Sequence, residues 1–193
     1  HLQKCFEDGS VVPMVLGAAS ENMGVQPLMQ TIIDVLPSAA EHAEIAELNS
    51  EPVEIVSDPD GDFVALAFKT QSDAHVGKVT WFRVYSGTLK SSSTLYNASK
   101  DQEERVGQLF FGRGKEHIPT DSVTAGDDGG VAKLESVDTG DTLTSGKKLK
   151  LDGIQFPHSA FSASVTPATQ ADTDKLGQAL QRMQDEDPSI VVS

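Results

Sequence analysis

Short apolar blocks crowd the middle of the sequence, and their spacing limits the folds that the chain can adopt. The blocks are FVALAFKT, KVTWFRVYSGTL, TLYN, ERVGQLFFG and GVAKL, all between residues 62 and 134. Clusters of Ser, Gly, Asp and Lys separate them, as is typical of turns between strands. The gaps are too short for crossover helices, so we expect a small barrel or sandwich with an antiparallel sheet.

Helical patterns flank this β-rich region on both sides. Residues 24–36 and 170–185 carry apolar side chains at helical spacing, and Pro37 and Pro188 follow them. The run VVPMVL, residues 11–16, predicts a buried strand, the alternation in residues 160–165 predicts another, and the apolar SIVV near the C-terminus predicts the start of a third. The Ala- and Glu-rich residues 39–52 predict a short solvated helix or a linker.

The formal net charge of −14 argues against a general nucleic-acid binder, because affinity for phosphate depends on Lys and Arg. The charges are unevenly distributed, however. Residues 53–151 hold twelve of the fifteen basic residues, against fifteen acidic ones in the same segment. Any RNA-facing patch is therefore expected in this middle segment, with ordinary strand-face Lys and Arg as the competing interpretation.

Several kinds of site are disfavoured by the sequence. The single cysteine, Cys5, excludes an internal disulfide framework and fits a reducing cytoplasm. No apolar stretch approaches the length of a membrane span, so we expect no membrane partner. The net negative charge also leads us to expect no DNA partner. Metal-ligand spacing is absent from the histidines, so no metal site is predicted; these residues are His1, His42, His75, His117 and His158.

Several blocks together resemble the elongation factor G family of translational GTPases. GVQPLMQTIIDVLPS, residues 24–38, is similar to the last helix of the family's G domain, and residues 63–97 resemble the first strands of its domain II. ERVGQLF and VTAGDDGGVAKLESVDTGDTL resemble the later strands of domain II. The segment from SVTPATQ to SIVV resembles the start of domain III, so the resemblance covers nearly the whole chain.

The resemblance implies a fragment with a defined fold and domain order. Expected are the C-terminal end of a G domain at residues 1–38, a linker at 39–52, domain II at 53–151 and the incomplete start of domain III at 152–193. The fold class is then mainly β: an antiparallel translation-factor β-barrel, flanked by a partial α/β G-domain end and a partial α+β ferredoxin-like domain III. Gly87, AGDDGG and TGDTL are expected to be turns in the barrel.

The same resemblance implies a parent protein that binds GTP and Mg²⁺. The phosphate-binding loop, the magnesium carboxylate and the Asn-Lys-x-Asp motif do not occur in this sequence, so no catalytic residues are predicted and the fragment alone should be inactive. The implied nucleotide element is the loop Gly17-Ala18-Ala19, where the family usually has Gly-Ser-Ala and backbone N–H groups reach the guanine carbonyl oxygen. The hydroxyl expected at position 18 is missing.

The implied partner is the ribosome, in the cytoplasm, with domain II as the barrel that docks on small-subunit rRNA and proteins. Ammonium and guanidinium groups pair with RNA phosphates. The candidates for these contacts are Lys69, Lys78, Arg83, Lys90, Arg105, Arg113 and Lys115.

Two alternatives remain open at this stage. The parent could be another translational GTPase, such as a recycling, ribosome-protection or release-type factor, or a paralogue that resembles elongation factor G. From a different class, it could be a non-catalytic scaffold that uses a translation-factor barrel for protein contacts, which the acidic composition and Ala18 support.

Overall fold

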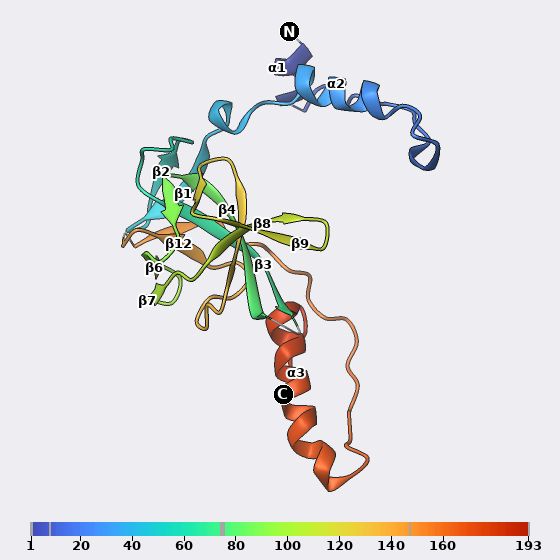
Figure 1. Ribbon diagram of the computed structural model, residues 1–193, viewed down its shortest axis with the longest axis vertical. Coiled ribbons are helices and arrows are strands. Elements are labelled where there is room, and N and C mark those ends of the chain that lie inside the picture. Colours follow the sequence, from blue (N-terminus) through green and yellow to red (C-terminus); the bar gives the residue numbers. More distant parts are fainter. Residues whose placement is uncertain (1, 8, 74–75, 147, 193) are drawn as a thin grey trace. The chain divides into compact units, whose positions relative to one another are not determined.

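The computed structural model describes residues 2–7, 9–73, 76–146 and 148–192. These residues form two compact units, residues 1–42 and residues 43–193. Figure 1 shows short helices in the first unit, and many strands with one long helix in the second. The described part of the chain contains no helix that is both long and apolar enough to cross a membrane.

The first unit contains helices and turns. They are α1 (Leu2–Glu7), the 3-10 turn η1 (Ala19–Glu21), α2 (Val25–Val35) and the 3-10 turn η2 (Ala39–Glu41). Helix α2 confirms the helix predicted over residues 24–36; it ends at Leu36 because the residue before a proline disfavours helical geometry. The strand predicted at residues 11–16 is wrong, since this run pairs with no strand and Val12, Met14 and Leu16 are 84–87% exposed.

The second unit is built from antiparallel strands, which confirms the predicted mainly β, antiparallel fold class. The strands are β1 (Glu44–Leu48), β2 (Glu51–Ile55), β3 (Val64–Asp73), β4 (Gly77–Ser86), β5 (Thr88–Lys90), β6 (Thr94–Asn97), β7 (Gln102–Arg105), β8 (Leu109–Arg113), β9 (Glu116–Thr120), β10 (Ser122–Thr124), β11 (Asp128–Ala132), β12 (Thr142–Thr144) and β13 (Leu149–Leu151).

Three sheets share these strands. The largest has the order β7-β6-β12-β3-β4-β11-β8-β9, and β10-β5 and β13-β1-β2 form the smaller sheets. The hydrogen-bonded ladder of the large sheet ends at β7 and β9 among the described residues, so the ladder itself is not a closed ring. Strands from distant places in this order nevertheless pack around one core, as in a barrel.

The main core consists of aliphatic and aromatic side chains that alternate inward along the strands. Its buried members come from the large sheet, the β10-β5 pair and the connecting loops: Phe63, Ala65, Ala67, Phe82, Val84, Leu89, Leu95, Val106, Leu109, Val123, Val131, Leu134, Val137 and Leu143. A second, smaller core lies under the β13-β1-β2 sheet and contains Ala46, Val64, Leu66, Leu149 and Leu151. Strand β3 contributes to both cores and therefore joins the sheets.

Three predicted elements are wrong, because a local sequence pattern does not show whether a strand has a pairing partner. The stretch expected to be a helix or linker at residues 39–52 contains β1 and the start of β2, because β1 pairs with both β2 and β13. The strand expected at residues 160–165 does not form, and neither does the one expected at SIVV; the described residues after β13 form only α3 (Gln170–Glu186). Helix α3 confirms the helix predicted over residues 170–185.

Beyond Leu66, where its pairing with β12 ends, the edge of β3 is covered by a loop and by α3 rather than by a strand. The N–H of Ala67 donates to the carbonyl of Asp141 (2.9 Å), and the N–H of Thr70 donates to Oγ1 of Thr139 (3.0 Å). Further along, the N–H of Ser72 donates to the Glu186 carboxylate at the end of α3 (2.7 Å). The Thr70 hydroxyl also donates to the carbonyl of Asp185. The edge donors are thus satisfied without a ladder.

Candidate functional site: the nucleotide loop and the basic residues

The loop Gly17-Ala18-Ala19 is held closed by backbone hydrogen bonds. The N–H of Ala18 donates to the carbonyl of Met23 (3.0 Å), and the N–H of Met23 donates back to the carbonyl of Ala18 (3.1 Å). Because both bonds use main-chain atoms, the missing hydroxyl at position 18 does not remove them. The loop has an ordered conformation in this chain without that side chain.

Gly24 closes the same loop and has no substitute. Its φ is +78°, and an ideal Cβ at this position would lie 2.4 Å from the carbonyl oxygen of Leu16. The Ala18 N–H is already engaged with Met23. In the described part of this loop, the N–H groups of Ala19 and Ser20, at the start of η1, make no backbone hydrogen bond. These two N–H groups remain available as hydrogen-bond donors.

Three of the seven predicted RNA-contact residues are neutralised by acidic neighbours. Nζ of Lys78 lies 2.9 Å from Asp138, and a guanidinium nitrogen of Arg83 lies 3.1 Å from Asp128. The guanidinium of Arg113 lies 2.7 Å from Glu116 across the β8-β9 hairpin. A cation that already has a carboxylate partner gains less from a phosphate, because it must first give up that contact.

The other four are exposed and form no ion pair with any residue that the structure describes: Lys69, Lys90, Arg105 and Lys115. They lie on different elements, namely β3, β5, the end of β7 and the β8-β9 turn. The structure brings Lys69 and Arg83 onto one face of the β3-β4 pair. The seven residues are spread over several strands and turns, from β3 at Lys69 to the β8-β9 turn at Lys115.

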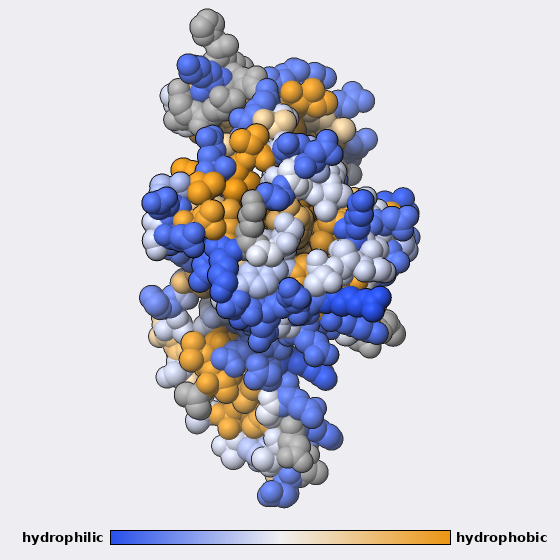
Figure 2. Space-filling view, turned by 90° about the vertical axis from the view of Figure 1, so that its left-hand side faces the viewer, coloured by the Kyte–Doolittle hydropathy of each residue, from blue (hydrophilic) through white to orange (hydrophobic). Residues whose placement is uncertain are grey.

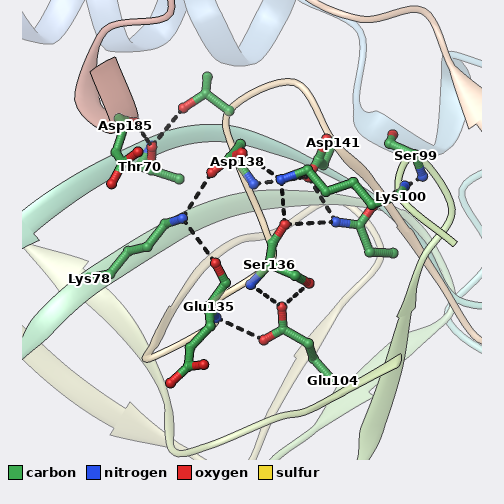
Figure 3. A network of polar contacts seen from close by, with 12 residues as sticks. Thr70, Lys78, Ser99, Lys100, Glu104, Glu135, Ser136, Asp138, Asp141 and Asp185 are labelled. Atoms are coloured by element: carbon green, nitrogen blue, oxygen red, sulfur yellow. Dashed lines mark hydrogen bonds and ion pairs between the residues drawn. The ribbon is translucent and has the colours of Figure 1, made fainter. Parts of the chain in front are cut away.

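A polar network beside the predicted basic residues has its centre at Asp138 and was not found by sequence reasoning (Figure 3). The Asp138 carboxylate accepts hydrogen bonds from Lys78 (2.9 Å) and Lys100 (2.5 Å). Asp141 accepts from the side-chain amide of Asn97 (2.8 Å) and from the N–H of Asp138 (2.9 Å). The TGDTL motif was the available signal, because acidic turn residues often bind their own backbone.

Glu104 fixes the other end of this network (Figure 3). Its carboxylate accepts the backbone N–H groups of Glu135 (2.9 Å) and Ser136 (2.5 Å), as well as the Ser136 hydroxyl. Lys100 donates to the carbonyl of Ser136 (2.6 Å). The loop that precedes β12 is therefore held from β7 and from the end of β6, and the lysines of the network have a structural role.

The electrostatics of the network follow from these contacts. Burial raises the pKa of Asp138, but hydrogen bonds from Lys100 and Lys78 outweigh it, so its pKa lies below the usual range. Burial lowers the pKa of Lys100, but its hydrogen bond to Asp138 and the charge of Asp141 raise that pKa above its ordinary value. The pair therefore favours its charged form.

We expect the substitution Asp138→Asn to lower the free energy of unfolding of residues 43–193 by about 1 kcal/mol at pH 7, because Lys78 loses its carboxylate and Lys100 loses the nearer of its two. The matched control is Asp128→Asn. The Asp128 side chain is about as exposed as that of Asp138 but among the described residues pairs only with Arg83, so this substitution should lower the free energy of unfolding by no more than a few tenths of a kcal/mol. Urea unfolding followed by the fluorescence of Trp81 measures both.

The stability difference between the unsubstituted chain and Asp138→Asn should depend on pH, and the lowered pKa of Asp138 sets the direction of that dependence. A lowered folded pKa stabilises the protein above the unfolded Asp pKa of about 3.9, and this contribution disappears as the pH falls through the folded value. The stability difference between the unsubstituted chain and Asp138→Asn should therefore shrink below about pH 4. Equal losses for both variants at pH 7 would contradict a special role for Asp138.

The histidines of the described part are not arranged around a metal. His42, His117 and His158 are exposed, whereas His1 and His75 lie outside the described residues. Within the described chain no group of three or more His, Cys, Asp or Glu side chains is placed to hold a metal ion. His117 instead stacks on the ring of Phe110, a contact that the sequence did not predict.

Comparison with known proteins agrees with the fold. The family description "Elongation factor G domain 2" matches residues 62–146, and "Elongation Factor G, domain III" matches residues 156–193. The second unit is thus a translation-factor β domain followed by residues of a further domain. These matches do not favour the scaffold alternative.

Individual relatives narrow the assignment. Elongation factor G from Petrotoga mobilis is 40% identical over 185 residues, which are 93% of this chain and 27% of the relative. A crystal structure of a protein from Thermus thermophilus superposes with a TM-score of 0.80 at 27% identity, over 100% of this chain and 27% of that one. The chain belongs to the elongation factor G family and spans about a quarter of the length of these relatives.

Proposed function

We propose that this chain is part of a GTP-dependent translation elongation factor that acts in ribosomal translocation in the cytoplasm. The observation that carries the proposal is the joint match to domain 2 and domain III, in the order and with the fold that the family requires. The 40% identical relative bears the name elongation factor G. GTP and Mg²⁺ would be bound by the whole protein, where hydrolysis of GTP supplies the energy for a conformational step.

The contribution of this chain to nucleotide binding would be limited to the base. The N–H groups of Ala19 and Ser20 would donate to the guanine carbonyl oxygen, and the Ala18–Met23 bridge would hold them in place. We propose the domain division given by the resemblance, with residues 1–38 closing the G domain, 53–151 forming domain II and 152–193 entering domain III. The pairing of β1 with β13 supports moving residues 44–52 from the linker into domain II.

Domain II would dock on small-subunit rRNA through the cations that have no carboxylate partner. Within a chain of net charge −14, only an uncompensated ammonium or guanidinium can gain a phosphate without losing an ion pair. Lys90 and Arg105 are exposed and meet this condition among the described residues, whereas Lys78, Arg83 and Arg113 do not. The free cations are therefore proposed as the docking contacts.

Charge reversal tests this proposal in the full-length protein. We expect the double variant Lys90→Glu, Arg105→Glu to weaken co-sedimentation with small ribosomal subunits and to lower the salt dependence of binding by about one unit of slope per lost contact. The control is Lys148→Glu, at a lysine already paired with Asp101 (2.9 Å). Binding and salt slope that match those of the unsubstituted protein would remove Lys90 and Arg105 from the interface.

A further inference from the structure

Three aromatic rings from three strands meet on the outer face of the large sheet. The ring centroids of Trp81 on β4 and Phe110 on β8 are 5.4 Å apart, at an interplanar angle of 88°. The ring of His117 on β9 stacks on Phe110 at 4.3 Å and 18°, and its centroid lies 5.7 Å from that of Trp81. These rings are on the side of the sheet opposite the main core, which takes Phe82 from the neighbouring position of β4.

Two glycines make room for the rings. An ideal Cβ at Gly130 would lie 2.3 Å from Cε2 of Phe110, and one at Gly112 would lie 2.8 Å from Cη2 of Trp81. Both glycines occupy strand positions, in β11 and β8, so their missing side chains leave the sheet backbone open to the rings. The rings therefore lie directly against the sheet, and their arrangement is set by close packing.

The cluster is graded from buried to exposed. Phe110 is only 5% exposed, Trp81 is half-buried, and His117 is exposed. The buried ring thus supports an outer aromatic surface that meets solvent. Figure 2 shows that the visible face of the molecule is mostly hydrophilic and that its hydrophobic residues gather in separate patches.

Two lysines that pair with no described carboxylate lie near the rings. Lys69 lies opposite Trp81 in the β3-β4 register, and Lys115 lies in the turn that leads into β9. Both form no ion pair within the described part of the chain. Arg83 and Arg113, which lie nearby on β4 and β8, are each balanced by one carboxylate. Two uncompensated cations therefore flank the aromatic surface, in a chain that is acidic as a whole.

We propose that the surface formed by Trp81, His117, Lys69 and Lys115 binds an unpaired nucleobase of RNA. The base stacks on the exposed aromatic rings, and the adjoining phosphates pair with the two ammonium groups. This inference rests on the proposed docking to rRNA and adds what is recognised there: a single-stranded nucleotide rather than a helix. The flanking cations favour RNA over a protein partner, because interface cores with proteins are depleted of lysine.

Trp81 provides a direct measurement, because it is the only tryptophan in the sequence. We expect a single-stranded oligoribonucleotide of about ten nucleotides to quench Trp81 emission on titration into the 193-residue chain. The same oligonucleotide annealed to its complement should quench much less. His117→Ala should weaken binding roughly tenfold, as expected for the loss of one stacking partner.

Matched variants separate stacking from other effects. His117→Phe keeps a ring and should restore most of the binding, whereas His158→Ala, at an exposed histidine elsewhere, should change nothing. Lys69→Gln should lower the salt slope by about one unit. Absence of quenching by the single strand, equal binding of the duplex, or failure of His117→Phe to restore binding would each overturn the proposal. Quenching by ribosomal proteins alone would also overturn it.

The two proposals fail in different ways. If Lys90→Glu, Arg105→Glu leaves co-sedimentation unchanged while the oligonucleotide still quenches Trp81, the docking contacts are wrong and the stacking site stands. If the full-length protein co-sediments with subunits but the chain shows no quenching, the docking function stands and the stacking site is wrong. Circular dichroism of each variant checks that its β structure is retained.

Discussion

Replacing Phe82 by alanine is expected to lower the free energy of unfolding of residues 43–193 by roughly 3–5 kcal/mol. Phe82 lies in the middle of β4 with 0% of its surface exposed and packs in the main core. Its loss removes a large apolar surface and leaves a cavity that the surrounding sheet cannot fill. Urea unfolding followed by Trp81 fluorescence measures the change, because Trp81 is adjacent in sequence.

The same substitution at Phe161 is the matched control. Phe161 is 84% exposed, so Phe161→Ala should change stability by less than about 0.5 kcal/mol. Similar losses at the two positions would show that the core around β4 is not the one described. A loss at Phe82 in the expected range, with none at Phe161, would place the main stabilising core in the β domain.

Gly87→Ala is expected to cost about 2–5 kcal/mol, the sum of backbone strain and overpacking. The φ of Gly87 is +75°, and an ideal Cβ would lie 2.6 Å from the backbone N and Cα of Phe63. The neighbouring atoms belong to main chain and cannot rotate away. The residue is also fixed by its own hydrogen bonds, since its N–H donates to the carbonyl of Asp58 (2.8 Å) and its carbonyl accepts from Ala125 (2.9 Å).

Gly77→Ala separates the two contributions. Gly77 also has a positive φ, +87°, but no atom lies within 4 Å of the ideal Cβ position. Its substitution should therefore show the strain alone, about 1–2 kcal/mol. If Gly87→Ala cost no more than Gly77→Ala in urea unfolding, the close approach to Phe63 would not hold in solution.

Much of the secondary structure could be predicted because the local pattern and the final pairing agree. The apolar blocks between residues 62 and 134 became β3, β4, β5, β6, β8 and β11, and their tight spacing left an antiparallel sheet as the simplest arrangement. Strands β9 and β10 lie outside these blocks. The helices α2 and α3 were predicted to within one or two residues, because apolar side chains recur at helical spacing and prolines follow them.

The wrong secondary-structure predictions concern segments whose structure depends on pairing with distant strands, which a local sequence pattern does not show. Residues 44–48 are rich in Ala and Glu and favour a helix, yet they form a strand because β2 and β13 pair with them on both sides. The apolar run at residues 11–16 has the composition of a strand but no partner. In AGDDGG, only Gly126 serves a turn, because Gly129 and Gly130 lie inside β11. Side chains of other strands fill the space beside them: Val123 and Phe82 at Gly129, and Phe110 at Gly130.

For the candidate site, the residue types were predictable and their partners were not. Lys78 is neutralised by Asp138, which is 60 residues away in the sequence, and Arg83 by Asp128, 45 residues away. Only the strand register reveals these pairs. The stacking of His117 on Phe110 likewise depends on the β8-β9 hairpin and on the glycine at position 130 of a third strand.

Helix α3 is attached to the edge of β3 by hydrogen bonds of a different kind from those between paired strands. Neighbouring strands separate only by opening a ladder of main-chain bonds, one after another. At the end of α3, by contrast, the Glu186 carboxylate accepts a hydrogen bond from the N–H of Ser72, and the carbonyl of Asp185 accepts one from the hydroxyl of Thr70. Water can replace two such bonds while the sheet stays intact, so the helix is joined to the β domain by a reversible contact and not by the fold itself.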